Sequence, residues 1–316
     1  MKIIPLEELD EFSKEYHTSV DVSKRTRSQS LQTQNHWTWK SFAIKPTHSM
    51  VMDSSSPLKG IKSVEFNPTE LCNRTCHFCP RVDPTVYPNR KLFMQEETVI
   101  NVINELIKYN YTGQIMFSGM GEPLLNRNIC NLIKICSEAG FFTEMTTNGD
   151  KIYNESWYSM QDFVDAGLSA IHVDIYDDTE QYLDWIDIAL PYRDKINFRI
   201  TPRFVLATGV FNNRAGDVKH GAIITDIPDD ECFSPSVKAF IDWDGTVQLC
   251  CHDWQRVGGN FGNVNTTPFT EIWNGDKMST IRKQLQTNSR RKLGSPCNNC
   301  TTGGNLHDKK KVLGIK

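Results

Sequence analysis

Three cysteines near residue 75 have the spacing of a metal site: Cys72, Cys76 and Cys79 form the pattern C-x3-C-x2-C. Thiolates this close together select zinc or an iron–sulfur cluster. A structural zinc and a cubane cluster both normally take four protein ligands, and only three are supplied locally. The open position indicates an exogenous ligand and therefore catalysis. A zinc site, or a cluster with a distant fourth cysteine, is the structural alternative.

A second group of cysteines lies toward the C-terminal end: Cys232, Cys250, Cys297 and Cys300. Four thiolates close a cubane cluster without an outside ligand, and a structural zinc is again the alternative. Cys130 and Cys136 fall beside or on the apolar face of a predicted helix, so we interpret them as ordinary buried residues. The chain therefore contains two separate candidate metal sites.

The 316 residues carry a formal net charge of −3, with no basic run that suggests nucleic acid or a membrane surface. The N-terminus lacks the apolar core of a secretory signal, and no apolar run approaches the length of a membrane span. We therefore expect a soluble, cytoplasmic protein with no nucleic-acid or membrane partner. In a reducing compartment, clustered cysteines indicate metal or redox chemistry rather than disulfides.

From residue 61 onward, strand and helix patterns alternate. Strands are predicted at 61–66, 114–117, 141–146, 169–176 and 196–204, with helices around 99–107, 129–136, 157–166 and 182–190. This alternation predicts an α/β fold, in which helices cover a parallel sheet that is open or closed into a full or partial barrel. Ligand sites of such sheets lie at the C-terminal ends of the strands, where the distinctive residues of this chain also lie.

The sequence divides into three parts. Residues 1–60 are a polar extension whose two tryptophans, Trp37 and Trp39, either pack on the body or cover a substrate opening. Residues 61–228 hold the alternating pattern. In residues 229–316 the alternation stops, Asp244-Gly245 predicts a hairpin turn, and a helix is expected around 269–285. This last part is small and polar enough to need an additional stabilising cross-link, such as a bound metal.

Three motifs at successive strand ends resemble the signature of the radical S-adenosylmethionine (SAM) superfamily. The first is the C-x3-C-x2-C loop, with the aromatic Phe78 before its third cysteine. The second is Ser118-Gly119-Met120-Gly121-Glu122-Pro123-Leu124, where Met120 replaces the first glycine of the family's Gly-Gly-Glu-Pro motif. The third is Thr146-Thr147-Asn148-Gly149. The resemblance implies a partial (β/α)6 barrel with a small C-terminal auxiliary-cluster domain.

The resemblance also implies a cofactor site. The open iron of the first cluster would be chelated by the amino and carboxylate groups of SAM. Gly121 and Glu122 would help to hold the methionine amino group, the glycine by allowing close backbone approach. The backbone of Phe78 would lie along the adenine, and Asn148 belongs to the same cofactor site. Asp174 stands where the family commonly places a serine near the ribose, and a carboxylate can bond ribose hydroxyls.

Two arginines follow on or just beyond the fifth predicted strand. Arg199 is assigned to the cofactor as a contact of the SAM carboxylate, and Arg203 as a base or a substrate contact. An ion pair in the barrel wall is the structural alternative for both. The segment Asn213-Arg214-Ala215-Gly216 resembles one found before the auxiliary domain in relatives, but the sequence attaches no mechanism to it.

The second cysteine group resembles the SPASM/Twitch extension of radical SAM enzymes. A full SPASM domain carries more cysteines after the final pair and holds two extra clusters, whereas residues 301–316 contain none. The match is therefore to the shorter form. The resemblance implies two [4Fe–4S] clusters, one that binds SAM and one auxiliary cluster, together with an external one-electron reductant such as flavodoxin or ferredoxin.

Three reactions fit such an enzyme: dehydrogenation of a secondary alcohol on a sugar or aminocyclitol, epimerisation at carbon, and modification of a ribosomally made peptide. Epimerisation requires a hydrogen donor, and Cys251, directly after Cys250, is the candidate; it could otherwise replace Cys250 as ligand or pack quietly. Residues 1–60 show no winged-helix pattern, which favours a small-molecule substrate over a peptide. The non-enzymatic alternative is a binding module in which zinc holds both cysteine groups.

Overall fold

A single sheet organises the protein. The computed structural model describes residues 37–39, 53–203, 212–219, 226–287 and 290–303. Their strands lie in the order β1-β6-β5-β4-β3-β2-β7-β8. Strands β2 to β7 pair in parallel, and the edge strands β1 and β8 are antiparallel to their neighbours. The predicted α/β class is confirmed.

The element bounds follow the sequence patterns closely. The strands are β1 (Trp37–Trp39), β2 (Ser63–Phe66), β3 (Gln114–Phe117), β4 (Phe142–Thr147), β5 (Ala170–Ile175), β6 (Asn197–Pro202), β7 (Lys238–Ile241) and β8 (Val247–Gln248). The helices are α3 (Glu96–Lys108), α4 (Ile129–Glu138), α5 (Asp150–Tyr153), α6 (Met160–Asp165), α7 (Thr179–Ala189), α8 (Ser234–Val237), α9 (Phe269–Asn274) and α10 (Asp276–Thr287). The helix expected around 269–285 is two helices that meet at Gly275.

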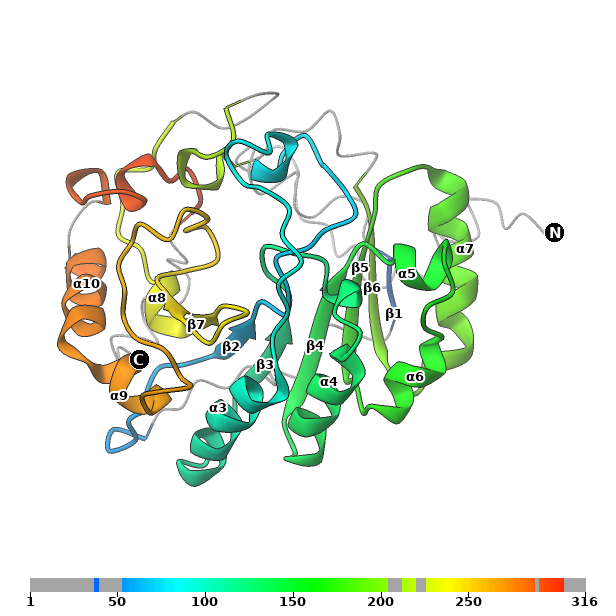
Figure 1. The fold of residues 1–316 in the computed structure, drawn as a ribbon, viewed down its shortest axis with the longest axis horizontal. Helices are drawn as coiled ribbons and strands as arrows, with labels where there is room; N and C mark the ends of the chain where they lie inside the picture. Colours follow the sequence, from blue (N-terminus) through cyan, green and yellow to red (C-terminus); the bar gives the residue numbers. More distant parts are fainter. Residues whose placement is uncertain (1–36, 40–52, 204–211, 220–225, 288–289, 304–316) are drawn as a thin grey trace, which may run out of the picture.

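The two faces of the sheet differ in chemistry. On β5, Ile171, Val173 and Ile175 belong to the main hydrophobic core, and helices α3, α4, α6 and α7 cover this side (Figure 1). Residues at the alternate positions of the strands point to the other side. We call that side the polar face. It comprises Glu65, Gln114, Glu144, His172, Asp174, Arg199, Arg203 and Lys238.

The C-terminal part continues the same sheet. Strand β7 pairs in parallel with β2, so the predicted boundary near residue 229 falls between two strands of one sheet. The buried side chains Phe269, Ile272 and Trp273 share the hydrophobic core of the barrel strands. The expected hairpin at Asp244-Gly245 links β7 to β8. Both parts of the chain therefore bury their apolar surface in one continuous core.

Part of the N-terminal extension also joins the sheet. Strand β1, which contains Trp37 and Trp39, pairs antiparallel with β6 and lies at the sheet edge. The rest of residues 1–52 lies outside the described residues, so a cover over the substrate opening stays a prediction. No helix in the described ranges is long and apolar enough to cross a membrane.

The shared core predicts that the barrel cannot fold without the C-terminal part. A chain truncated after residue 228 loses the β7 pairing of β2 and three large core side chains, each of which contributes about 2–5 kcal/mol. That loss approaches the whole stability of a typical protein, about 5–15 kcal/mol. We expect the truncated chain to show no cooperative thermal unfolding by circular dichroism. A cooperative transition in residues 1–228 alone would contradict this.

Candidate cluster-binding and active site

The first cysteine loop follows β2, at the C-terminal edge of the sheet, which is the upper edge in Figure 1. Burial raises the pKa of Cys72 to about 11 and that of Cys76 to about 12, and the neighbouring sulfurs add to the rise at both. Three half-buried thiolates side by side are unfavourable unless a cation binds them, which suits an iron–sulfur cluster. Among the described residues no three side chains already stand in metal-ligand geometry, so the sulfurs would have to turn toward a common centre on binding.

Residues between the cysteines hold this loop to the next strand ends. Arg74 donates through Nε and Nη2 to both carboxylate oxygens of Asp150, after β4, at 2.7 and 2.6 Å. It also bonds both oxygens of Asp177, after β5, at 2.7 Å. Asn73 donates to Asp150 at 2.6 Å and accepts from Asn148 at 2.9 Å. Bidentate arginine–carboxylate pairs fix geometry well, so the loop is positioned before any cluster binds.

The Gly-Glu-Pro motif fits closely against the same loop. A Cβ on Gly121 would lie 2.0 Å from the carbonyl oxygen of Thr69, so only glycine fits there. The buried Glu122 side chain accepts from the backbone of Leu124 and Asn148 and from the hydroxyl of Thr147. Burial raises the pKa of Glu122 to about 7, against these three hydrogen bonds. Glu122 therefore joins the ends of β3 and β4, and its predicted contact with SAM stays a prediction.

Two aromatic rings lie beside the loop. Phe78 stacks on Tyr176 with ring centroids 6.1 Å apart, and the Arg74 guanidinium lies 5.2 Å from the Tyr176 centroid. The rings give the loop a flat apolar surface at the end of β5. This arrangement is compatible with the adenine expected along Phe78.

The polar face pairs its charges internally. Arg203 Nε lies 2.8 Å and His172 Nε2 lies 3.1 Å from Asp174 Oδ1. Burial opposes ionisation of Asp174, but His172 and Arg203 together lower its pKa below the usual range. The ion pair that the sequence left open for Arg203 is thus observed, and the ribose contact of Asp174 stays a prediction. Burial lowers the pKa of Arg199, which lies near Asp174, and its SAM contact also stays a prediction.

His172 was missed by the sequence analysis. Its Nε2 also lies 2.8 Å from Thr201 Oγ1 on β6, so it links two strands. The sequence feature that could have identified His172 is its position in the strand 170–175, where it and Asp174 are the two polar residues among apolar ones.

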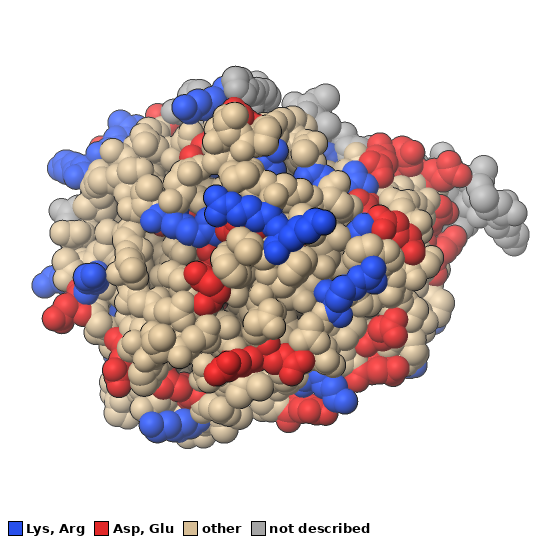
Figure 2. Space-filling view, in the orientation of Figure 1, with Lys and Arg blue, Asp and Glu red and all other residues tan. Residues whose placement is uncertain are grey.

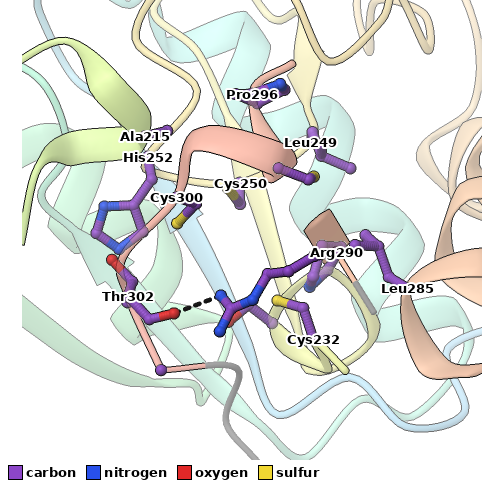
Figure 3. Close-up of a pocket in the computed structure, with 14 residues that line it drawn as sticks. Ala215, Cys232, Leu249, Cys250, His252, Leu285, Arg290, Pro296, Cys300 and Thr302 are labelled. Atoms are coloured by element: carbon purple, nitrogen blue, oxygen red, sulfur yellow. Dashed lines mark hydrogen bonds between the residues drawn. The ribbon is translucent and has the colours of Figure 1, made fainter. Parts of the chain in front are cut away.

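The second cysteine group surrounds one cavity. Figure 3 shows Cys232, Cys250 and Cys300 around it, and Cys297 also lines it. Burial raises the pKa of all three of Cys232, Cys250 and Cys297, and other members of the group contribute. The four cysteines come from three separate segments and line one space, which suits four-thiolate ligation of a closed cluster.

The segment Asn213–Gly216 caps this cavity. Asn213 exchanges hydrogen bonds with the backbone and hydroxyl of Thr301 and donates to the carbonyl of Asn299 at 2.7 Å. Ala215 lines the cavity. Arg214, Ala215 and Gly216 all have positive φ, a costly conformation for the first two, which the Asn213 contacts hold in place.

The strained turn places Arg214 near Cys79 and Cys251. Its charge lowers the pKa of both Cys79 and Cys251, against the larger effect of burial. Its guanidinium makes no hydrogen bond or ion pair with any described residue. Arg214 is therefore a cation close to the first cysteine loop, a position that the sequence alone does not indicate.

Cys251 lies toward the first cysteine loop. It packs with Cys79 against a buried cluster that includes Met120 and Phe240. Burial raises its pKa to about 11, and the nearby carboxylate of Glu65 adds to the rise. Cys251 is absent from the residues that line the auxiliary cavity, whereas Cys250 is among them. The geometry therefore favours Cys250 as the ligand.

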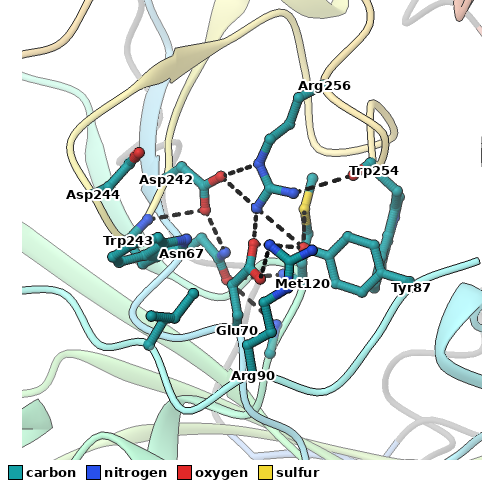
Figure 4. Close-up of polar contacts among 12 residues, drawn as sticks. Asn67, Glu70, Tyr87, Arg90, Met120, Asp242, Trp243, Asp244, Trp254 and Arg256 are labelled. Carbon is teal, nitrogen blue, oxygen red and sulfur yellow. Dashed lines mark hydrogen bonds and ion pairs between the residues drawn. The ribbon is translucent and has the colours of Figure 1, made fainter. Parts of the chain in front are cut away.

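A buried ionic network joins the two halves of the site (Figure 4). Arg256, from the C-terminal part, bonds Asp242 Oδ2 at 2.7 Å and also Glu70 Oε1 beside the first cysteine loop. Asn67 donates to Asp242 Oδ1 at 2.7 Å and accepts from the backbone of Met120 at 2.9 Å. The contact of Asn67 with Asp242 and that of Arg256 with Glu70 each join residues more than 170 positions apart in the sequence.

Comparison with known proteins agrees with this geometry. Residues 66–208 match the radical SAM superfamily, and residues 232–301 match SPASM, an iron–sulfur cluster-binding domain. The chain belongs to the radical SAM superfamily. It is accordingly a radical SAM enzyme, whose cofactors are SAM and a [4Fe–4S] cluster together with auxiliary iron–sulfur binding in the SPASM region. The cysteine loop and the four-cysteine cavity fit these groups.

Two curated proteins are similar in sequence to this chain. The S-adenosyl-L-methionine-dependent 2-deoxy-scyllo-inosamine dehydrogenase of Niallia circulans is 25% identical over 256 residues, which span 75% of this chain and 91% of that protein. The S-adenosylmethionine-dependent nucleotide dehydratase of Flammeovirga pacifica is 31% identical over 141 residues, or 43% of this chain and 40% of that protein.

A solved structure shows the same fold. The crystal structure of BtrN in complex with AdoMet and 2-DOIA has a TM-score of 0.62 and 22% sequence identity. The match covers 77% of this chain and 93% of that chain. The partial-barrel architecture and the C-terminal SPASM region are therefore shared.

The tight fit of Gly121 predicts a substitution that selectively disturbs the cofactor site. In Gly121→Ala the new methyl group displaces the backbone at Thr69, so we expect SAM to bind at least about tenfold more weakly, about 1.4 kcal/mol. The measurement is equilibrium dialysis with labelled SAM on anaerobically reconstituted protein. Gly294→Ala is the control, because no atom lies within 4 Å of its added Cβ. Equal SAM affinity in both variants would refute the assignment.

Proposed function

We propose that this radical SAM enzyme oxidises a secondary alcohol of a polar small molecule, such as a sugar or aminocyclitol, to a ketone. The observation that carries the proposal is the polar face of the sheet, which lies below the first cysteine loop. Three acidic residues (Glu65, Glu144 and Asp174) and three basic residues (Arg199, Arg203 and Lys238) lie on this face. Such a surface binds hydroxyl and amino groups rather than apolar side chains.

One ion pair on this face, Glu65 with Lys238, offers both an acceptor and a donor to a ligand. The Glu65 side chain is almost fully buried, accepts from Ser118 through Oε1 and lies 3.3 Å from Lys238 Nζ through Oε2. Glu65 Oε2 has no hydrogen bond of its own. Glu65 and Lys238 thus form a polar pair on this face that would bond a substrate hydroxyl or amino group.

The oxidation needs two electrons and two protons to leave the substrate. When bound, SAM and the reduced first cluster supply a radical that takes one hydrogen atom from the substrate carbon, and an auxiliary cluster suits the acceptance of the second electron. The remaining proton would pass from the hydroxyl group to a carboxylate of the polar face, such as Glu65, as the carbonyl forms. Arg214, which lies near Cys79 and Cys251, would bind the oxygen as its negative charge develops.

The relatives favour the same reaction class. The Niallia circulans dehydrogenase aligns along 91% of its length with this chain and acts on an aminocyclitol. The Flammeovirga pacifica dehydratase aligns along only 40% of its length, so it says less about substrate chemistry. As reductant we propose an external one-electron carrier of the flavodoxin or ferredoxin type, in the cytoplasm.

Epimerisation is the second candidate function, because Cys251 packs against the same buried cluster as Cys79 and is absent from the residues that line the auxiliary cavity. In this reaction the Cys251 thiol gives a hydrogen atom to the carbon radical from the opposite side. The sulfur-centred radical that remains must then gain one electron and one proton to restore the thiol. The external reductant proposed above supplies that electron.

Isotopic labelling tests the dehydrogenase proposal. Aminocyclitols and sugars deuterated at a carbinol carbon are incubated anaerobically with reconstituted enzyme, SAM and dithionite. We expect one substrate to yield a ketone together with 5′-deoxyadenosine that contains one deuterium, both detected by mass spectrometry. Unlabelled 5′-deoxyadenosine with every alcohol, together with modification of a peptide, would overturn the proposal.

Cys251→Ala separates dehydrogenation from epimerisation. For a dehydrogenase we expect the variant to keep turnover within about threefold of wild type, with no solvent deuterium in the product from deuterated water. For an epimerase the variant would lose product and the wild type would incorporate one solvent deuterium. Cys130→Ala is the matched control, since Cys130 packs against the main core away from both cysteine groups.

A further inference from the structure

A single buried arginine lines the auxiliary cavity. Arg290 is 1% exposed and ranks among the largest fully buried side chains of the described residues. Figure 3 shows its guanidinium entering the space beside Cys232. Fully buried arginines are rare unless they are paired, so this position needs a physical reason.

The contacts of Arg290 reach two chain segments that hold cysteines. Nε donates to Asp230 Oδ1 at 3.0 Å, and Nη2 donates to the same oxygen at 2.5 Å. Nη1 donates to the carbonyl oxygen of Thr302. Asp230 lies two residues before Cys232, and Thr302 lies two residues after Cys300. One planar side chain thus joins the first and the last cysteine segments of the cavity.

Arg290 also brings positive charge to the sulfurs. Its guanidinium lines the same cavity as the four cysteines and lies beside Cys232 (Figure 3). A cluster bound by four thiolates is anionic, and a further electron adds negative charge. The reduction potential of an iron–sulfur cluster depends on the net charge and hydrogen bonds around it. A buried cation beside the cavity therefore favours the reduced state.

We propose that Arg290 is a positioning residue and internal counter-cation of the auxiliary cluster. It holds the Cys232 and Cys300 segments at the distance that one cluster spans, and it raises the reduction potential of that cluster. The role does not depend on which substrate the enzyme oxidises. Asp230 completes the arrangement by orienting the guanidinium and by partly offsetting its charge.

The test isolates the auxiliary cluster. In a background with Cys72, Cys76 and Cys79 all replaced by alanine, only the four-cysteine cavity retains cluster ligands. The full-length protein is reconstituted anaerobically with iron and sulfide and titrated with dithionite, and the reduced cluster is followed by electron paramagnetic resonance. Arg290→Gln is compared with Arg291→Gln, which removes a neighbouring arginine that is half exposed and bonds Asp226 and Ile227.

We expect Arg290→Gln to lower the reduction potential by an amount equal to about a tenfold change in the ratio of oxidised to reduced cluster, 59 mV for one electron. Arg291→Gln should stay at the parent value. Asp230→Asn removes a negative charge from the same place and should shift the potential in the opposite direction. Opposite shifts in these two variants cannot come from a general loss of packing, which would move both alike.

Arg290→Lys separates the two parts of the role. Lysine keeps the charge but cannot bond Asp230 and Thr302 together, so we expect a nearly unchanged potential and faster loss of iron to a chelator. The proposal is overturned if Arg290→Gln leaves the potential at the parent value, or if Arg290→Gln and Asp230→Asn shift it in the same direction. If Arg290→Gln binds too little iron, the Asp230→Asn shift alone decides the electrostatic part, and an absent shift refutes it.

Discussion

The buried ion pair between Arg256 and the carboxylates of Glu70 and Asp242 is the constraint on which the site depends. Glu70 stands beside the first cysteine loop, and Asp242 follows the strand that leads to the auxiliary cysteines. Two buried carboxylates without their arginine would be strongly unfavourable, about 3–5 kcal/mol for one broken buried pair. The network therefore fixes the separation between the two cluster sites, and any substrate oxidised between them must fit that separation.

Thiolates alone do not shape either cluster site. Burial and mutual repulsion raise the pKa of the cysteines. Bringing the free thiols together therefore stabilises the folded loops little. Neighbouring polar side chains supply the order instead. Arg74 ties the first loop to two strand ends, and Asn213 and Arg290 tie the later segments to one another. In each case a side chain with several hydrogen-bond donors bonds a carboxylate or a backbone carbonyl. These bonds order the flexible loops at a lower cost in free energy than the sulfur atoms alone would.

Much of the fold could be predicted from the sequence, because local periodicity determines whether a segment is strand or helix. The strands at 114–117 and 170–175 and the hairpin at Asp244-Gly245 follow from alternation and turn chemistry. Pairings distant in sequence carry no such local signal. The parallel pairing of β7 with β2 and the contact of Arg256 with Glu70, 186 residues apart, depend on how the chain folds back. The cysteine spacing likewise predicts two metal sites but not the arginines that hold them.

Loops and strands carry different kinds of site residue, which explains why the reaction chemistry is easier to infer from the sequence than the substrate. Of the residues expected to hold the cofactors, the cysteines and Gly121 lie in loops, where Gly121 closely approaches the backbone of Thr69, whereas Asp174 and Arg199 lie on strands. Residues of the polar face lie on the strands, where a change of side chain leaves the backbone pairing intact. Substrate preference can therefore diverge while the radical chemistry is kept. Glu65, Lys238 and Cys251 meet where β2 and β7 pair. Under the proposed function, a proton acceptor or a hydrogen donor at that junction would decide whether the carbon radical becomes a ketone or an inverted centre.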